Sequence, residues 1–126
     1  MSKSIKGAIK NFVPSFKGSV NQKGMLVIKE AGTLALTVDT GFSGAIALPE
    51  PVLDEMKIEL ADYGIFRLAT GEEVELPVFW GTVAVREEKL ETWFIPGDSL
   101  LGMEFLSLAG SLLVVDFRKQ IVKLSK

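Results

Sequence analysis

The chain has 126 residues, of which 48% are hydrophobic, and a formal net charge of −2. It contains no His and no Cys, which excludes Ser–His and Cys–His nucleophile pairs, zinc sites built from those residues, and disulfides. No basic run exceeds two residues and no apolar run approaches the roughly 20 residues of a membrane span, so we expect neither nucleic acid nor a membrane as partner.

The N-terminal segment differs from the rest of the chain. Residues 1–10 contain lysines that interrupt any apolar core, so they do not form a signal peptide and the expected location is the cytoplasm. We interpret residues 1–20 as an N-terminal extension, either flexible or an edge strand. Residues 21–126 have the length and composition of one domain.

Short, often β-branched apolar runs separated by turn residues predict an all-β domain. The runs at residues 25–28 and 33–38 flank a short loop that contains Gly32, which favours a hairpin. After it the pattern predicts a short helix at 48–57 and a hairpin at 66–78, which turns at Gly71 and has Pro77 in an edge strand. A strand pair at 81–95, a helix at 103–108, a buried strand at 112–115 and a last strand at 120–124 follow.

Asp39 is the first residue to suspect of catalysis. It ends the apolar strand 34–38 and opens a loop that contains Gly41 and Gly44. A carboxylate near a core must be hydrogen-bonded, paired or protonated. Strand alternation places it on the face opposite Leu36, which is the side suited to a cleft. A simple turn-forming role for the Asp-Thr-Gly run is the alternative.

Four features taken together resemble the retropepsin-like aspartic proteases. They are Asp39-Thr40-Gly41 after a hydrophobic strand, the short helix around residues 53–56, Ala69-Thr70-Gly71 at a hairpin tip, and Leu100-Leu101-Gly102 before a second helix. The resemblance covers roughly residues 20–124. It implies a single-lobed, closed acid-protease barrel of the six-stranded type with one or two short helices.

The resemblance also implies a reaction. One Asp-Thr-Gly supplies half a site, so the chain would act as a homodimer in which two copies of Asp39 activate water to hydrolyse a peptide or protein substrate, without cofactor or metal. Thr40 would bond across the dimer axis, Gly41 would donate to the carboxylate, residues 69–71 would close as a flap, and Leu101 and Gly102 would support the Asp39 loop.

The active-site loop departs from the retroviral pattern. Phe42 stands where a small residue is usual, Ser43-Gly44 replaces acids that grip the substrate backbone, and the flap has only Gly71 at its tip. Phe42 and the glycine-poor flap motivate an alternative function, a non-catalytic peptide-binding or dimerisation module. A further hypothesis has residues 1–20 covering the cleft. The tryptophans 80 and 93 are interpreted as core or dimer surface.

Overall fold

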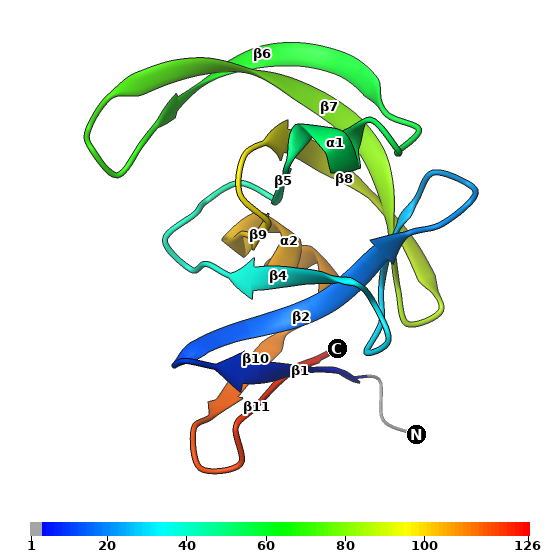
Figure 1. Cartoon of the computed structure of the whole chain (residues 1–126), viewed down its shortest axis with the longest axis vertical. Helices are drawn as coiled ribbons and strands as arrows, with labels where there is room; N and C mark the ends of the chain where they lie inside the picture. The colour runs from blue at the N-terminus through cyan, green and yellow to red at the C-terminus, as the bar shows by residue number, and fades with distance from the viewer. Residues whose placement is uncertain (1–3) are drawn as a thin grey trace.

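A computed structural model describes residues 4–126. The molecule is mostly β, with 56% of its residues in strands and 9% in helices (Figure 1). Its elements are β1 (Ser4–Lys10), β2 (Val13–Val20), β3 (Leu26–Ile28), β4 (Leu34–Val38), β5 (Ile46–Leu48), α1 (Glu50–Leu53), β6 (Glu59–Arg67), β7 (Glu73–Val85), β8 (Glu88–Pro96), β9 (Leu100–Leu101), α2 (Met103–Ala109), β10 (Leu112–Asp116) and β11 (Ile121–Ser125).

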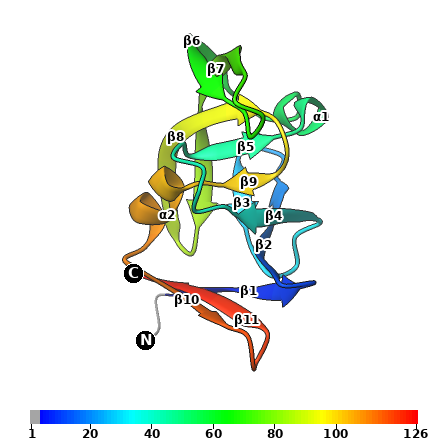
Figure 2. The ribbon, with the colours of Figure 1, turned by 90° about the vertical axis from the view of Figure 1, so that its left-hand side faces the viewer.

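The sheet closes into a barrel. Neighbouring strands follow the order β2, β3, β7, β8, β5, β9 and β4, and β4 pairs with β2 again. The expected all-β barrel is confirmed, and it closes through seven strands rather than six. Strands β1, β11 and β10 continue the sheet outward from β2, and Figure 2 shows these three strands side by side below the barrel.

Aromatic side chains fill the core between distant elements. Phe16 of β2, Phe94 of β8 and Phe105 of α2 are all fully buried. Along β7, Val83 and Val85 point inward, as the two-residue period of a strand requires. Burial of each phenylalanine side chain stabilises the fold by roughly 2–3 kcal/mol. The core therefore depends on contacts between residues far apart in the sequence.

Residues 4–20 belong to the sheet, which corrects their interpretation as an extension. Strand β1 lies between β11 and β2, with Ser4 opposite Ser125 and Ala8 opposite Ser15. The turn between β1 and β2 has positive φ at Asn11 and Phe12, as a tight hairpin turn requires. Neither strand is at an edge of the sheet. Residues 1–3 lie outside the described part of the chain.

Strands β3 and β4 do not form the expected hairpin with each other. Both pair with β2, so that Gly18 lies opposite Ile28 on one side and Leu34 on the other. The connecting loop passes so close to β2 that a Cβ on Gly32 would lie 2.4 Å from the backbone nitrogen of Gly18. The hairpin prediction was wrong because a strand from earlier in the chain occupies the position between the two runs.

The later elements agree better with the sequence pattern. Both short helices, the β6–β7 hairpin and the β7–β8 pair form where they were expected. Gly71 has φ +90° at the tip of the β6–β7 hairpin, and Pro77 lies where β7 has only β6 as a neighbour. We call this hairpin the flap, from Glu59 to Val78.

Strand β10 also differs from the expectation. The run at 112–115 was expected to be buried because it is apolar on both faces. Instead β10 is an edge strand that pairs only with β11, and Leu112 is 58% exposed. The physical reason is that nothing among residues 4–126 covers its outer face.

Candidate active site

Asp39 is positioned by two parallel strands. Val38 at the end of β4 lies opposite Leu101 of β9, and the Asp39 N–H donates to the Leu101 carbonyl at 3.0 Å. The Asp-Thr-Gly and Leu-Leu-Gly runs, about sixty residues apart in the sequence, are thus neighbours in space. The Leu100-Leu101-Gly102 segment supports the first residue of the Asp39 loop directly.

The loop after β4 folds around the Asp39 carboxylate. The Gly41 N–H donates to Asp39 Oδ1 at 3.0 Å, and the Phe42 N–H donates to the Asp39 carbonyl at 3.1 Å. These two bonds form a tight turn that fixes the carboxylate relative to its own backbone. Asp39 is partly exposed, whereas Thr40, Gly41 and Ser43 are exposed.

Gly102 allows the loop and the start of α2 to approach closely. Its N–H donates to the Ala45 carbonyl at 2.7 Å, and the next N–H, of Met103, donates to the Phe42 carbonyl at 2.8 Å. A Cβ on Gly102 would lie 2.1 Å from the Gly44 carbonyl oxygen. Only glycine fits there, so the second motif determines the path of the loop from Phe42 to Ala45.

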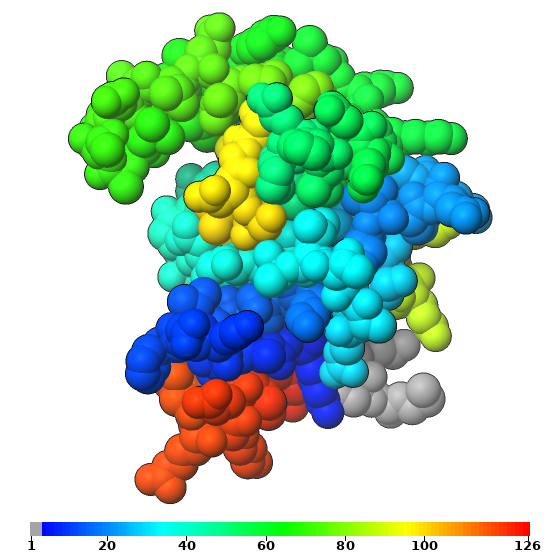
Figure 3. Space-filling model, viewed as in Figure 1, coloured from blue at the N-terminus to red at the C-terminus, as the bar shows by residue number. Residues whose placement is uncertain are grey.

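The Asp39 loop and the flap enclose one cleft of about 770 Å³. Figure 3 shows the flap tip projecting over a hollow above the loop that follows β4. Five of the residues selected from the sequence line this cleft: Asp39, Gly41, Phe42, Ala69 and Leu100. The size suits a small ligand or several residues of an extended peptide.

The other selected residues lie around the cleft rather than in its wall. Leu101 and Gly102 are buried. Thr40, Ser43, Thr70 and Gly71 are exposed at the two loop tips, and Gly44 lines a neighbouring pocket. None of residues 4–20 lines the cleft, so the described part of the N-terminal segment does not cover it.

Sequence reasoning missed several residues that line the cleft. Arg67 contributes from the end of the first flap strand, where it pairs with Glu73 at 4.0 Å, and Asp98 contributes from the turn between β8 and β9. The remaining apolar wall comes from Phe66, Leu76, Ile95 and Pro96. The sequence did contain a signal for Asp98. Like Asp39, it is an acidic residue in a glycine-containing turn that follows an apolar strand.

Within residues 4–126, no group of three or more acidic side chains is arranged to hold a metal ion, and no helix is long and apolar enough to cross a membrane. Comparisons with known proteins found no matching family, no similar curated protein and no similar solved structure. The chemistry of the cleft therefore has to be argued from its own residues.

Asp39 is the residue best placed for chemistry in this cleft. Its Oδ1 is held by a backbone N–H, and its side chain is partly open to a ligand that lies beneath the flap. A carboxylate in that position binds and polarises water or a ligand N–H, and it accepts or donates a proton when a second acidic group is close. Asp98 is a further acid in the same wall.

Proposed function

We propose that the protein is an aspartic endopeptidase of the retropepsin-like type that acts as a homodimer. The observation that carries the proposal is the single cleft formed by the Asp39 loop on one side and the flap on the other. The position of Asp39 agrees with this function, because Leu101 binds its backbone N–H while the Gly41 N–H binds Oδ1 of its carboxylate.

The proposed chemistry uses a pair of Asp39 carboxylates, one from each copy. Two carboxylates about 4 Å apart repel by roughly 4 kcal/mol at an effective dielectric constant of about 20, so the pair retains one proton. The ionised member removes a proton from water as it attacks the scissile carbonyl. The protonated member donates to the carbonyl oxygen to give a gem-diol. The carboxyl that took the proton from water then passes it to the amide nitrogen as the C–N bond breaks, and no covalent enzyme intermediate forms.

Surface features agree with a second copy on the open side of the cleft. The Asp39 loop, the flap tip and the β1–β2 and β10–β11 turns all lie toward the left of Figure 1, the side that faces the viewer in Figure 2. Two of these turns expose large aromatic side chains, with Phe12 87% and Phe117 60% exposed. Burial of these side chains against a second copy would offset part of the entropy lost on association.

Replacement of Asp39 by Asn tests the reaction directly. We expect Asp39→Asn to lower the cleavage of a peptide library by at least about a thousandfold, because the dyad loses its ionisable group while the shape of the loop is kept. Asp98→Asn is the matched control, since it removes one charge from the same cleft. Undiminished cleavage by Asp39→Asn, or equal losses in both variants, would contradict the assignment.

The alternative function is a peptide-binding module without catalysis. Phe42 favours it, because its ring lies in the wall of the cleft and also 2.7 Å from where a Cβ on Gly44 would stand. A bulky ring in the cleft wall takes up space and adds apolar contact for a bound peptide. Peptide binding without turnover between about pH 3 and 8 would support the binding module over the enzyme.

A further inference from the structure

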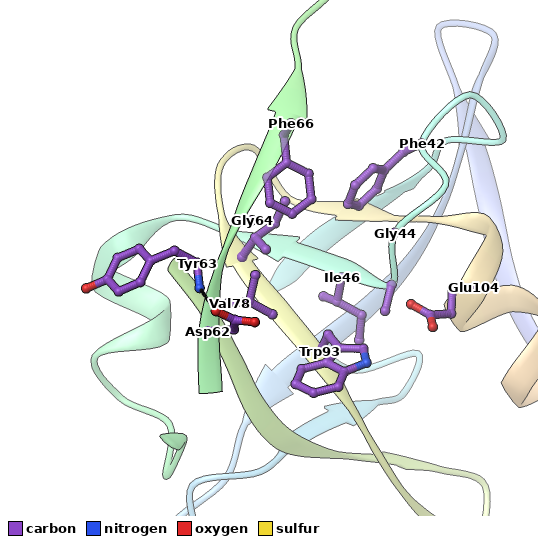
Figure 4. Close-up of a pocket in the computed structure, with 12 residues that line it drawn as sticks. Phe42, Gly44, Ile46, Asp62, Tyr63, Gly64, Phe66, Val78, Trp93 and Glu104 are labelled. Atoms are coloured by element: carbon purple, nitrogen blue, oxygen red, sulfur yellow. Dashed lines mark hydrogen bonds between the residues drawn. The ribbon is translucent and has the colours of Figure 1, made fainter. Parts of the chain in front are cut away.

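A second pocket of about 290 Å³ adjoins the cleft. Phe42, Phe66 and Ile95 line both hollows, so a chain that lies beneath the flap passes the mouth of this pocket. Figure 4 shows the pocket between the first flap strand, the loop after β4 and the start of α2. It is therefore placed to accept a side chain of a ligand that occupies the cleft.

The inner wall of the pocket is apolar and aromatic. Ile46 and Val78 contribute from β5 and β7, and Trp93 contributes an indole that is 38% exposed. Trp80 packs edge-on against Trp93 with ring centroids 4.3 Å apart, which fixes the orientation of the exposed indole. Such a wall suits the methylene groups of a long side chain, and the indole face also attracts a cation.

Two carboxylates flank this apolar wall. In Figure 4 Asp62 and Glu104 lie on opposite sides of Trp93. Asp62 accepts one hydrogen bond, from the Tyr63 N–H at 2.8 Å, and Glu104 has no hydrogen-bond or ion-pair partner for its side chain among residues 4–126. No Lys or Arg among residues 4–126 lines the pocket, so none of them neutralises its negative charge locally.

We propose that this pocket selects a Lys or Arg side chain of the peptide that occupies the Asp39 cleft. The methylene stem packs on Trp93 and Ile46, and the exposed carboxylates of Asp62 and Glu104 attract the cationic end. The inference rests on the proposed function only in that a peptide occupies the cleft. It adds the substrate class, a peptide with a basic residue at one fixed position.

Binding to a protein that cannot turn over tests the pocket separately from catalysis. The probes are capped hexapeptide pools with one fixed residue, either Lys, norleucine or Glu, titrated against Asp39→Asn while tryptophan fluorescence is recorded. Norleucine has the same stem as Lys without the charge. We expect the best Lys pool to bind at least about fivefold more tightly than the matching norleucine pool, and the Glu pool to bind most weakly.

Charge-removing variants then identify the carboxylates responsible. Adding Asp62→Asn and Glu104→Gln to the Asp39→Asn protein should make the Lys and norleucine pools bind equally. Adding Glu87→Gln, an exposed acid on the β7–β8 turn, should leave the preference for Lys intact. Equal binding of Lys and norleucine pools before these changes, a preference that survives the double change, or no binding of any pool would overturn the inference.

The two proposals fail separately. Cleavage by the unmodified protein without a preference for Lys or Arg would refute the basic-residue pocket and leave the peptidase intact. A preference for Lys in binding, together with no cleavage of any pool by the unmodified protein, would refute the peptidase and leave the pocket intact.

Discussion

Gly102→Ala is the sharpest test of how the site is built. The new methyl group would lie 2.1 Å from the Gly44 carbonyl oxygen and 2.7 Å from the Phe42 carbonyl oxygen, so the backbone must move. Three hydrogen bonds connect residues 102–104 to this loop, at 2.7, 2.8 and 3.2 Å. Loss of two or three at about 1 kcal/mol each, with about 1–3 kcal/mol of overpacking, predicts a destabilisation of about 3–6 kcal/mol.

Urea unfolding followed by circular dichroism measures this loss. With a slope of about 1.5–2 kcal/mol per molar urea, the midpoint should fall by about 1.5–4 M. Gly97→Ala is the matched control, because its methyl group would meet only the Ala47 Cβ at 3.6 Å, an ordinary contact. If Gly102→Ala unfolds at the same urea concentration as Gly97→Ala, the account of the close approach between the two motifs is refuted.

Three further predictions concern the rest of the fold. Phe16→Ala should destabilise the protein by about 3–5 kcal/mol in urea, and a loss of less than about 1 kcal/mol would contradict the place of β2 in the core. Deletion of residues 1–20 should abolish the folded circular-dichroism spectrum rather than raise activity, and an active truncated protein would refute the role of the β1–β2 hairpin. The side chains of Lys126 and Arg86 hydrogen-bond to Glu88 and lower its pKa from the ordinary 4.5. The resulting stabilisation is therefore present above pH 4.5 and is lost as the pH falls through the lower pKa of the folded state. We expect the free energy of unfolding of Glu88→Gln to fall less steeply at acid pH than that of the unmodified protein. An unchanged acid dependence would contradict this role of Glu88.

The parts of the fold that the sequence predicted are the local ones. The flap hairpin depends on alternating apolar residues and on Gly71, whose positive φ few other residues adopt. The helix from Met103 ends before Gly110, as its composition indicated. Each of these elements depends on residues that are close to one another in the sequence, so the pattern of a short segment is sufficient to predict it.

The errors come from pairing between distant segments. Nothing in the run 33–38 indicates that β2, from earlier in the chain, separates it from residues 26–28. The N-terminal strand did carry a signal, because Ile5 and Ile9 alternate with exposed Lys6 and Lys10 at a period of two, but the lysines obscured it. For β10, an apolar run does not reveal whether another element covers it.

The residues of the candidate site likewise divide into those that a local sequence pattern predicts and those that only the fold brings together. Asp39 was found from its place between an apolar strand and a glycine-containing turn, whereas Gly102 was singled out only through the resemblance carried by Leu100-Leu101-Gly102. The pocket beside the cleft was not found, because Asp62, Trp93 and Glu104 come from three elements and no local pattern connects them. Trp93 was interpreted as core or dimer surface; it is 38% exposed rather than core, and it lines that pocket.

The construction of strand β7 determines how the flap can move. Its residues from Phe79 onward pair with β8 in the barrel, whereas its earlier residues pair only with β6 in the flap. At this boundary β6 has a bulge between Leu60 and Asp62, and Pro77 supplies no N–H to the ladder. Both features weaken the pairing of β6 with β7 where the flap leaves the barrel. We therefore expect the flap to move as a unit about this line on a microsecond-to-millisecond timescale. Asp62 and Val78 lie both at this line and in the pocket wall. A side chain bound in the pocket would therefore restrict the motion of the flap.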